Sequence, residues 1–395
     1  MLKSPHNPVR TIEDDDITSA RILVVDDLES SRRLIGAVLE QAGFRHLDFA
    51  EDGPTALERM AHKPDMVVLD IVMPGLDGFQ VCQRIRAELS REIPILMQTG
   101  MQEDDYRVRA FDAGASDIVS KPIDAGELVS RVRLHLERRR MMSSLQVYRR
   151  RMEEDLRVAQ AMQQSLLKPA GEIEAIVKPR RAGLSTFYRA SNTLGGDLWQ
   201  VFPVDETRFG LFMVDLSGHG VSAAINAFRV HMLAAGMSDL ADQPGAWMEA
   251  LNRALVDMLP VEQFATGFYG LVDVPGGVMQ YAAAASPSPL HYRADGSWTA
   301  LDASGLLLGC DARAVYPVRQ CPLGAGDRVF VYSDALYENF RNPTAALDTP
   351  QLADVVGTAL TGGADFQSAL LQRLFGSADA HVDDDLTWLL LEAGA

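Results

Sequence analysis

Between residues 19 and 125, short apolar runs alternate five times with segments that have the pattern of helices. The runs are RILVVD, HLDFA, DMVVLD, PILMQTG and SDIVS. A continuous apolar run such as RILVVD is typical of a strand that is buried on both faces. Regular alternation of such strands with helices predicts a doubly wound parallel α/β sheet, whose site lies at the carboxyl ends of the strands.

Polar residues stand where that rule places a site. The residues at the ends of the first, third, fourth and fifth strands are Asp26, Asp27, Asp70, Thr99 and Lys121. Three carboxylates at one sheet edge repel each other unless a cation lies among them, and Mg²⁺ is the natural candidate. A lysine and a hydroxyl beside them would hold phosphoryl oxygens. A single Asp is more often a cap or turn residue, but five such residues at strand ends favour a site.

The segments VVDD, VVLDIVMPGLDGF and SKP, together with Thr99, resemble the receiver domain of bacterial response regulators. The resemblance implies a flavodoxin-like fold for residues 19–125 and a sensor histidine kinase as phosphodonor. The residue roles it implies are phosphoacceptor for Asp70, switch hydroxyl for Thr99, phosphate partner for Lys121, and Mg²⁺ ligands for Asp26, Asp27, Asp70 and the carbonyl of Val72. Ile118 departs from the pattern, since the family often has Tyr or Phe there, so the usual aromatic side-chain movement does not carry over.

Residues 126–168 are expected to form one long helix, because neither Gly nor Pro occurs between Glu127 and Lys168. Apolar residues recur along it at heptad spacing, interrupted by Asp155: Met141, Leu145, Tyr148, Met152, Ala159, Met162 and Leu166. This seam favours a parallel two-stranded coiled coil and therefore a homodimer. The alternative is a single amphipathic helix that lies on one of its own domains. His135 does not indicate a phosphorylated histidine, since the chain has no kinase ATP-site motif.

Residues 170–395 have many short strands, with helices expected near 221–235 and 244–258, a pattern that predicts an α+β or α/β/α sandwich fold. The stretch RFGLFMVDLSGHG combines a buried strand, an acid at its end and a glycine-rich turn. Such an arrangement suits a hard cation, although an Asp there could instead cap the following helix. Acids recur at strand ends and turns at Asp197, Asp215, Asp334 and Asp384. Oxygen ligands suit Mg²⁺ or Mn²⁺, and two such ions can activate water for attack on a phosphate ester.

The segments AQAMQQSLLKP, GGDLW, MVDLSGHG, VYSDALYE and DDDLTWLLL resemble the bacterial metal-dependent serine/threonine phosphatases of the PPM family, which are PP2C-like and SpoIIE-type. The resemblance implies an α/β/α sandwich that holds two Mn²⁺ or Mg²⁺ ions. It makes Asp215 a bridging and catalytic ligand, with the Leu216 carbonyl, Asp334 and Asp384 completing the site and Asp197 beside it. A metal-bound hydroxide would attack phosphorus directly.

Three departures from this family are visible. Gln200 replaces a second acid after GGD, Ala335 stands where Gly is usual, and the common GHPPPL loop is replaced by Ser286–Leu290. None removes a core carboxylate, but they bear on metal affinity and substrate recognition. His219 in the glycine turn is expected to orient the loop rather than to act as an acid.

Composition narrows the functional classes. The net charge of −17 argues against nucleic acid as a partner, because phosphate contacts require clustered Lys and Arg. The chain's 3 cysteines have no CxxC spacing, which favours a reducing compartment. No apolar run approaches the roughly 20 residues of a membrane span, and the first residues lack a signal-peptide core. We therefore expect a cytoplasmic protein without membrane contact, with residues 1–18 as a disordered tail.

The sequence thus predicts a response regulator whose output is a phosphatase. The resemblance implies a phosphoserine or phosphothreonine protein substrate, typically a STAS-fold anti-sigma-factor antagonist in a partner-switching pathway that controls a stress response. The alternative is a non-catalytic adaptor that binds a sigma factor or another regulator through the phosphatase-like domain. Such adaptors lose the metal acids, so the presence of Asp197, Asp215, Asp334 and Asp384 favours catalysis.

Overall fold

The computed structural model describes residues 17–90, 92–100, 104–191, 193–218, 220–260, 262–336, 347–362, 365–377, 382 and 384–394. The chain divides into two compact units, with the boundary between Met152 and Glu153. Each unit has its own sheets and its own buried core. Among the described helices, none combines the length and the apolar character needed to cross a membrane.

The first unit contains one five-stranded sheet in which all neighbouring strands are parallel. Its strands are β1 (Arg21–Val25), β2 (His46–Ala50), β3 (Met66–Asp70), β4 (Ile95–Thr99) and β5 (Asp117–Ser120). Their order is β2-β1-β3-β4-β5, which is the flavodoxin-like order. The predicted doubly wound sheet is confirmed.

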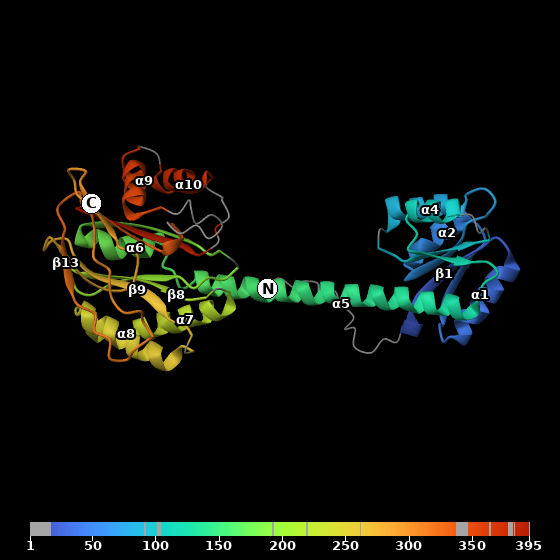
Figure 1. The fold of residues 1–395 in the computed structure, drawn as a ribbon, viewed down its shortest axis with the longest axis horizontal. Helices are drawn as coiled ribbons and strands as arrows, with labels where there is room; N and C mark the ends of the chain where they lie inside the picture. Colours follow the sequence, from blue (N-terminus) through green and yellow to red (C-terminus); the bar gives the residue numbers. More distant parts are fainter. Residues whose placement is uncertain are drawn as a thin grey trace, which may run out of the picture. The chain divides into compact units, whose positions relative to one another are not determined.

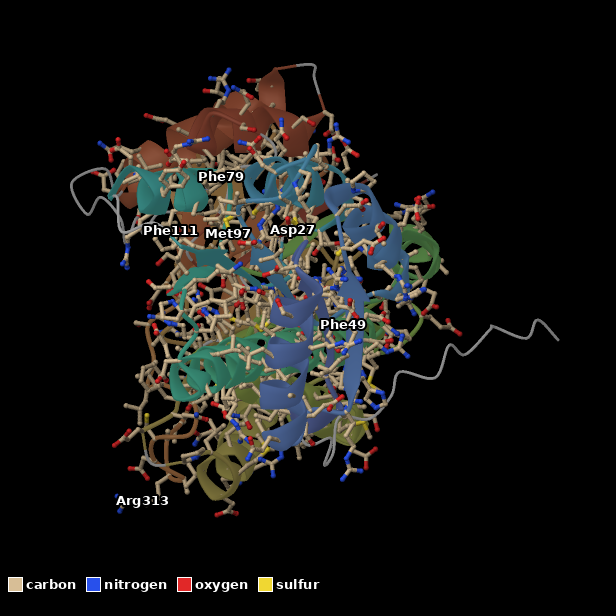
Figure 2. All side chains as sticks on the ribbon, turned by 90° about the vertical axis from the view of Figure 1, so that its right-hand side faces the viewer. Asp27, Phe49, Phe79, Met97, Phe111 and Arg313 are labelled. Carbon is tan, nitrogen blue, oxygen red and sulfur yellow. The ribbon has the colours of Figure 1, made fainter. Side chains whose placement is uncertain are left out.

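Helices cover both faces of this sheet (Figure 1). They are α1 (Glu29–Gln41) and the first turns of α5 (Ala125–Gln164) on one face, and α2 (Gly53–Arg59), α3 (Gly78–Arg84) and α4 (Asp104–Asp112) on the other. Short turns of other helix types lie at Ile17–Ser19, Met60–His62 and Ile85–Leu89. Figure 2 labels the fully buried Met97 of β4 and the half-exposed Phe111 of α4.

Helix α5 is continuous over 40 residues, as the absence of Gly and Pro predicts. Its first turns bury Leu128, Val132 and Leu136 against the parallel sheet. Beyond them the predicted heptad seam is exposed from Met141 to Met152, where Leu145 has 62% and Tyr148 65% of its surface accessible, whereas Ala159 and Leu166 are partly buried. The seam is therefore available to a partner, and the coiled coil stays a prediction.

The second unit contains two antiparallel five-stranded sheets. The strands of the first, in spatial order, are β13 (Arg319–Pro322), β10 (Val278–Ala284), β9 (Ala265–Asp273), β8 (Phe209–Leu216) and β7 (Leu198–Pro203). Those of the second are β12 (Trp298–Ala300), β11 (Leu290–Tyr292), β14 (Arg328–Tyr332), β15 (Leu386–Ala393) and β6 (Ala182–Arg189).

Each of these sheets has helices on its outer face (Figure 1). Helices α7 (Val221–Ala235) and α8 (Pro244–Met258) cover the first sheet, and α9 (Thr349–Thr361) and α10 (Phe366–Phe375) cover the second. A third core fills the space between the sheets, with α6 (Ala170–Val177) packed at its edge. The predicted sandwich is confirmed, and its central layer consists of two sheets because both have an apolar inner face.

Candidate functional site

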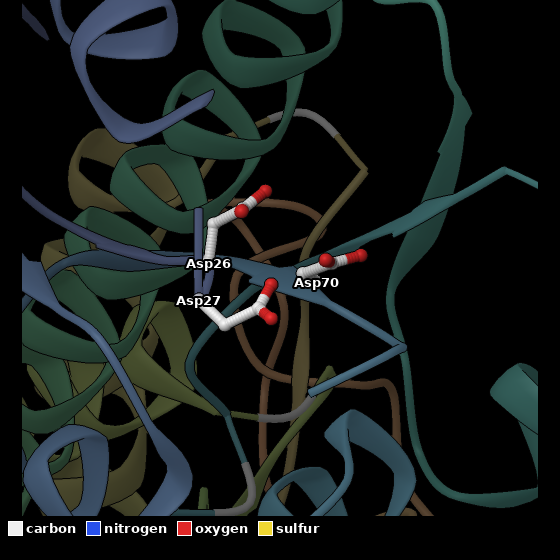
Figure 3. Close-up of side chains that lie close together, drawn as sticks. All are labelled: Asp26, Asp27 and Asp70. Atoms are coloured by element: carbon white, nitrogen blue, oxygen red, sulfur yellow. The ribbon is translucent and has the colours of Figure 1, made fainter. Parts of the chain in front are cut away.

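At the carboxyl edge of the parallel sheet, three carboxylates meet. One oxygen from each of Asp26, Asp27 and Asp70 lies within 4.8 Å of the others, and Figure 3 shows the three side chains converging from the ends of β1 and β3. Asp26 and Asp70 are buried. Burial raises the pKa of Asp70, and hydrogen bonding to Lys121 opposes that rise. The set consists of hard oxygen ligands, so its chemistry fits Mg²⁺.

Lys121 supplies the positive charge in this cluster. Its ammonium lies 2.9 Å from Asp26 Oδ2 and 2.8 Å from Asp70 Oδ2. Burial alone would lower the pKa of Lys121, but hydrogen bonds to the two carboxylates raise it. The ammonium is therefore fixed beside Asp70, where it can neutralise oxygens added to that carboxylate.

Thr99 is buried at the end of β4, beside the strand that carries Asp70. The Val72 backbone N–H donates to the Asp70 carboxylate, so the loop after β3 folds over the acid. A Cβ on Gly78 would lie 2.2 Å from the Asp70 carbonyl oxygen, which explains the glycine at the start of α3. Ile118 is buried in the core on β5 and leaves no aromatic ring at that position.

The second unit also brings its acids together. Asp215 lies on β8, Asp197 precedes β7, Asp334 follows β14 and Asp384 precedes β15. Burial, followed by repulsion from Asp334 and Asp384, raises the pKa of Asp215 to about 7. Burial, followed by repulsion from Asp215 and Asp385, raises the pKa of Asp197 well above its usual range. Such mutual repulsion requires that acids from both sheets face one region.

The donor chemistry of this region fits divalent cations. The Asp197 and Asp215 carboxyls lie close enough for each to affect the pKa of the other. When both are ionised they repel each other, and a divalent cation between them would offset that repulsion. Asp197 Oδ1 is buried and has no hydrogen-bond partner among the described residues. In the part of the chain that the structure describes, however, only Asp26, Asp27 and Asp70 bring three acidic ligand atoms within 4.8 Å of one another.

Two glycines allow the turn before Asp197 to pack closely. A Cβ on Gly195 would lie 2.2 Å from Asp385 Oδ2, and a Cβ on Gly196 would lie 2.7 Å from the Leu216 carbonyl oxygen. The latter is the carbonyl expected among the metal ligands, so the turn places Asp197 beside it. Only glycine leaves room for both approaches.

The sequence motif indicates Asp384 as a metal ligand and assigns no role to its neighbour Asp385. The Asp385 carboxylate accepts from the backbone N–H groups of Ser191 and Gly196, and from the Ser191 hydroxyl. Thr387 in the same segment donates its hydroxyl to Asp197 Oδ2. Asp385 is therefore satisfied by the protein and braces the turn. The signal was present in the run DDDLT, but spacing alone does not distinguish ligand from brace.

The departures from the family pattern have local partners. The side-chain amide of Gln200 bonds His231 of α7, and Ala335 is buried in the core under α9 and α10. His219, Asp383 and the first 16 residues lie outside the described residues, so their expected roles stay predictions.

Two models of known protein families match the chain, one in each unit. The family model described as "Response regulator receiver domain" matches residues 22–133, and the model described as "Stage II sporulation protein E (SpoIIE)" matches residues 205–394. The second match includes Asp215, Asp334 and Asp384 and begins after Asp197.

Similar proteins match one part of the chain each. Response regulator PleD of Caulobacter vibrioides is 44% identical over 117 residues, which is 29% of this chain and 26% of PleD. Phosphate regulon transcriptional regulatory protein PhoB of Escherichia coli is 38% identical over 120 residues, which is 30% of this chain and 52% of PhoB. The chain thus spans about a quarter to a half of these relatives.

Among solved structures, the SiaA-PP2C domain of Pseudomonas aeruginosa matches with a TM-score of 0.54 and 18% identity, covering 62% of this chain and 98% of that one. At this identity the match establishes the fold of the second unit.

Proposed function

Because this chain is a response regulator that joins a receiver domain to a SpoIIE-type, PP2C-like domain, we propose that its output is metal-dependent dephosphorylation of phosphoserine or phosphothreonine on a protein. The observation that carries the proposal is that Asp197, Asp215, Asp334 and Asp384 come from strands or strand ends of both sheets and lie close enough to raise the pKa of Asp197 and Asp215. We take the receiver as residues 19–125, the linker helix as 126–168 and the phosphatase domain as 170–395.

In the receiver, a histidine kinase would supply the phosphoryl group and Asp70 would accept it. Asp26, Asp27, Asp70 and the Val72 carbonyl would hold Mg²⁺, which neutralises the phosphoryl oxygens when bound. The Lys121 ammonium, 2.8 Å from Asp70, is in place to pair with one of those oxygens. The Thr99 hydroxyl would bond another and report the modification.

In the phosphatase domain, Asp215, the Leu216 carbonyl, Asp334 and Asp384 would hold two Mn²⁺ or Mg²⁺ ions, with Asp197 beside them. Two divalent ions activate water and stabilise the developing charge when a phosphate ester is hydrolysed. The carboxylates of these acids would hold the two positively charged ions in place. Asp385 and Thr387 keep Asp197 oriented through the contacts described above.

For the biological setting, we propose a phosphorylated STAS-type protein as substrate, in a cytoplasmic partner-switching pathway that ends at a sigma factor. The exposed seam of α5 suits a homodimer through the linker helix. Phosphorylation of Asp70 would then alter the packing of the linker and, through it, the activity of the output domain.

The test is hydrolysis of p-nitrophenyl phosphate by the full chain with Mn²⁺ or Mg²⁺. The wild type is compared with Asp215→Ala and with Asp239→Ala, which removes an exposed acid outside the site. Metal-dependent turnover that is lost only in Asp215→Ala supports the enzyme. Repeating the assay with beryllofluoride, with Asp70→Asn as its control, tests whether the receiver regulates the output.

Absence of turnover by folded wild type, on both this ester and a phosphorylated STAS protein, would overturn the proposal. Stable binding of a regulator without turnover would then identify the adaptor instead.

A further inference from the structure

Gln163, in the last turn of α5, is a buried polar residue within an otherwise exposed stretch. Its surface is 6% accessible, whereas Met162 before it is 57% accessible and Gln164 after it is exposed. A primary amide carries two donors and an acceptor, and its burial is unfavourable unless they are bonded. Gln163 therefore needs partners inside the second unit, to which it belongs.

Both partners are main-chain atoms of one residue. Gln163 Nε2 donates to the Gly195 carbonyl at 2.6 Å, and Gln163 Oε1 accepts from the Gly195 N–H at 3.2 Å. Two bonds to the same glycine fix the orientation of the turn as well as its position.

The opposite side of the same turn is held by Asp385. Its carboxylate accepts from the Gly196 N–H and comes so close to Gly195 that no side chain would fit there. The turn that carries Asp197 is thus clamped between the end of α5 and the start of β15. Asp385 fixes one side from within the phosphatase sheet, and Gln163 fixes the other from the linker helix.

The end of α5 is itself anchored. Directly after it, Leu167 packs against both the core between the sheets and the core under α7 and α8, and Leu166 joins the latter. A rotation of the helix end would move Gln163 with it, because only one turn of backbone separates the amide from these anchors. The position of the helix end is therefore linked to the position of the Asp197 turn.

We propose that Gln163 is a positioning residue which, through its two hydrogen bonds to Gly195, holds the Gly195–Asp197 turn in the conformation that presents the Asp197 carboxylate to the metal site. The inference rests on the proposed function for the identity of the site. It adds that the metal affinity of the phosphatase domain depends on the end of the linker helix.

The test uses the full chain with three substitutions. Gln163→Met keeps the length and removes both bonds, Gln163→Glu keeps the acceptor and places an oxygen against the Gly195 carbonyl, and Gln164→Met is the matched control on the neighbouring exposed residue. Mn²⁺ binding is measured by isothermal titration calorimetry, and p-nitrophenyl phosphate hydrolysis is measured as a function of Mn²⁺ concentration. Circular dichroism and thermal unfolding establish that each variant is folded.

We expect Gln163→Met to weaken Mn²⁺ binding at the phosphatase site about 10-fold or more, in the range known for residues that orient metal ligands. The Mn²⁺ concentration for half-maximal rate rises equally, while the rate at saturating Mn²⁺ changes little. Gln163→Glu shows a similar or larger loss, and Gln164→Met behaves as wild type.

A double-mutant cycle with Asp197→Asn separates positioning from general damage. If Gln163 acts through Asp197, Gln163→Met has little further effect on Mn²⁺ affinity in the Asp197→Asn background. Wild-type Mn²⁺ affinity in both folded Gln163 variants, or full additivity with Asp197→Asn, overturns the inference. If the wild type binds Mn²⁺ in a Gln163-dependent way without hydrolysing any ester, the proposed function fails and the positioning role stands.

Discussion

At the scale of single residues, Gly196 shows how closely the site is packed. A Cβ there would lie 2.7 Å from the Leu216 carbonyl oxygen, which is a main-chain atom and cannot rotate away. We expect Gly196→Ala to displace the turn, lowering stability by about 1 to 3 kcal/mol and weakening Mn²⁺ binding. Thermal unfolding and calorimetric titration measure the two effects.

Gly171→Ala is the matched control, because among the described residues no atom outside its own helix backbone and chain neighbours lies within 4 Å of an added Cβ. It exchanges the same two residue types in the same unit and should leave Mn²⁺ binding unchanged. Equal Mn²⁺ affinity in Gly196→Ala would show that the Leu216 carbonyl and the Asp197 turn are not parts of one site.

Lys121 is the residue on which the charge balance of the receiver depends. Its ammonium contacts both Asp26 and Asp70, and Asp26 is fully buried. Removing one partner of a buried ionic group leaves the others uncompensated, so we expect Lys121→Met to destabilise the receiver at neutral pH by about 2 to 4 kcal/mol without Mg²⁺. Added Mg²⁺ should recover part of that loss, since it supplies positive charge to the same carboxylates.

Calorimetry of the full chain with and without Mg²⁺ measures this, with Arg107→Met as a control that removes an exposed cation of the same unit. An unchanged receiver transition without Mg²⁺ would mean that the carboxylates do not require the ammonium.

The residues also show what sequence could and could not predict. The acids of the receiver were predictable because parallel strands end at one edge of the sheet. Asp26 and Asp70 therefore meet, although the residues that pair between β1 and β3 are 44 positions apart in the chain. The bracing of Asp197 was not predictable, because Asp385 and Gln163 are 188 and 32 positions away from the atoms they hold. No local period links such positions, and only the packed fold brings them together.

At the scale of elements, one carboxylate joins α5 to β5 through polar contacts. Asp117, at the start of β5, accepts hydrogen bonds from Arg131 and His135 of α5. Burial raises the pKa of Asp117, but the bonds from Arg131, Ile118 and His135 outweigh it and the pKa lies below its usual value. The ionised form is therefore favoured in the folded state, and its stabilisation is present above the unfolded-state pKa of about 4.

We expect Asp117→Asn to destabilise the first unit at pH 7 by about 1 to 3 kcal/mol, because the hydrogen bonds to a charged acceptor are weakened. The difference in unfolding free energy from wild type should shrink as the pH falls below the unfolded-state pKa of about 4. Asp117 then becomes protonated as the pH approaches its lower pKa in the folded protein. Denaturant titrations of the full chain at pH 7 and pH 3.5, following the receiver transition, measure it. A difference that is constant with pH would exclude Asp117 ionisation as the cause.

The elements themselves followed from simple patterns. Continuous apolar runs gave the five parallel strands, and the absence of Gly and Pro gave α5. The layering of the second unit was harder, since β12 and β13 are only 3 and 4 residues long and carry little periodic signal. Their places at sheet edges are set by pairing with β11 and β10, which a local pattern does not encode.

At the scale of the whole molecule, the exposed apolar seam of α5 bears on whether two chains associate. Met141, Leu145 and Tyr148 are each more than three-fifths accessible and recur at heptad spacing. Burial of one such side chain stabilises by about 1.5 to 3 kcal/mol, so a seam of several in each of two copies is enough to hold a dimer. The receiver lies at one end of this helix in the chain and the phosphatase domain at the other.

We expect the full chain to form dimers at micromolar concentration and Leu145→Glu to shift them to monomers, because a charge would enter the centre of the seam in both copies. Gln146→Glu adds the same charge one residue away, about 100° round the helix, and should leave the dimer intact. Sedimentation velocity over a concentration series measures the equilibrium for the three proteins.

The same variants connect assembly with regulation. If the linker transmits the state of Asp70 through a paired helix, beryllofluoride should change the hydrolysis rate of wild type and of Gln146→Glu but not of Leu145→Glu, although Leu145→Glu still binds it at the receiver. A wild type that is monomeric throughout, or a Leu145→Glu monomer with an unchanged response, would place transmission within a single chain. In that case the contact between Gln163 and Gly195 would be a structural link between the helix and the metal site that needs no second copy.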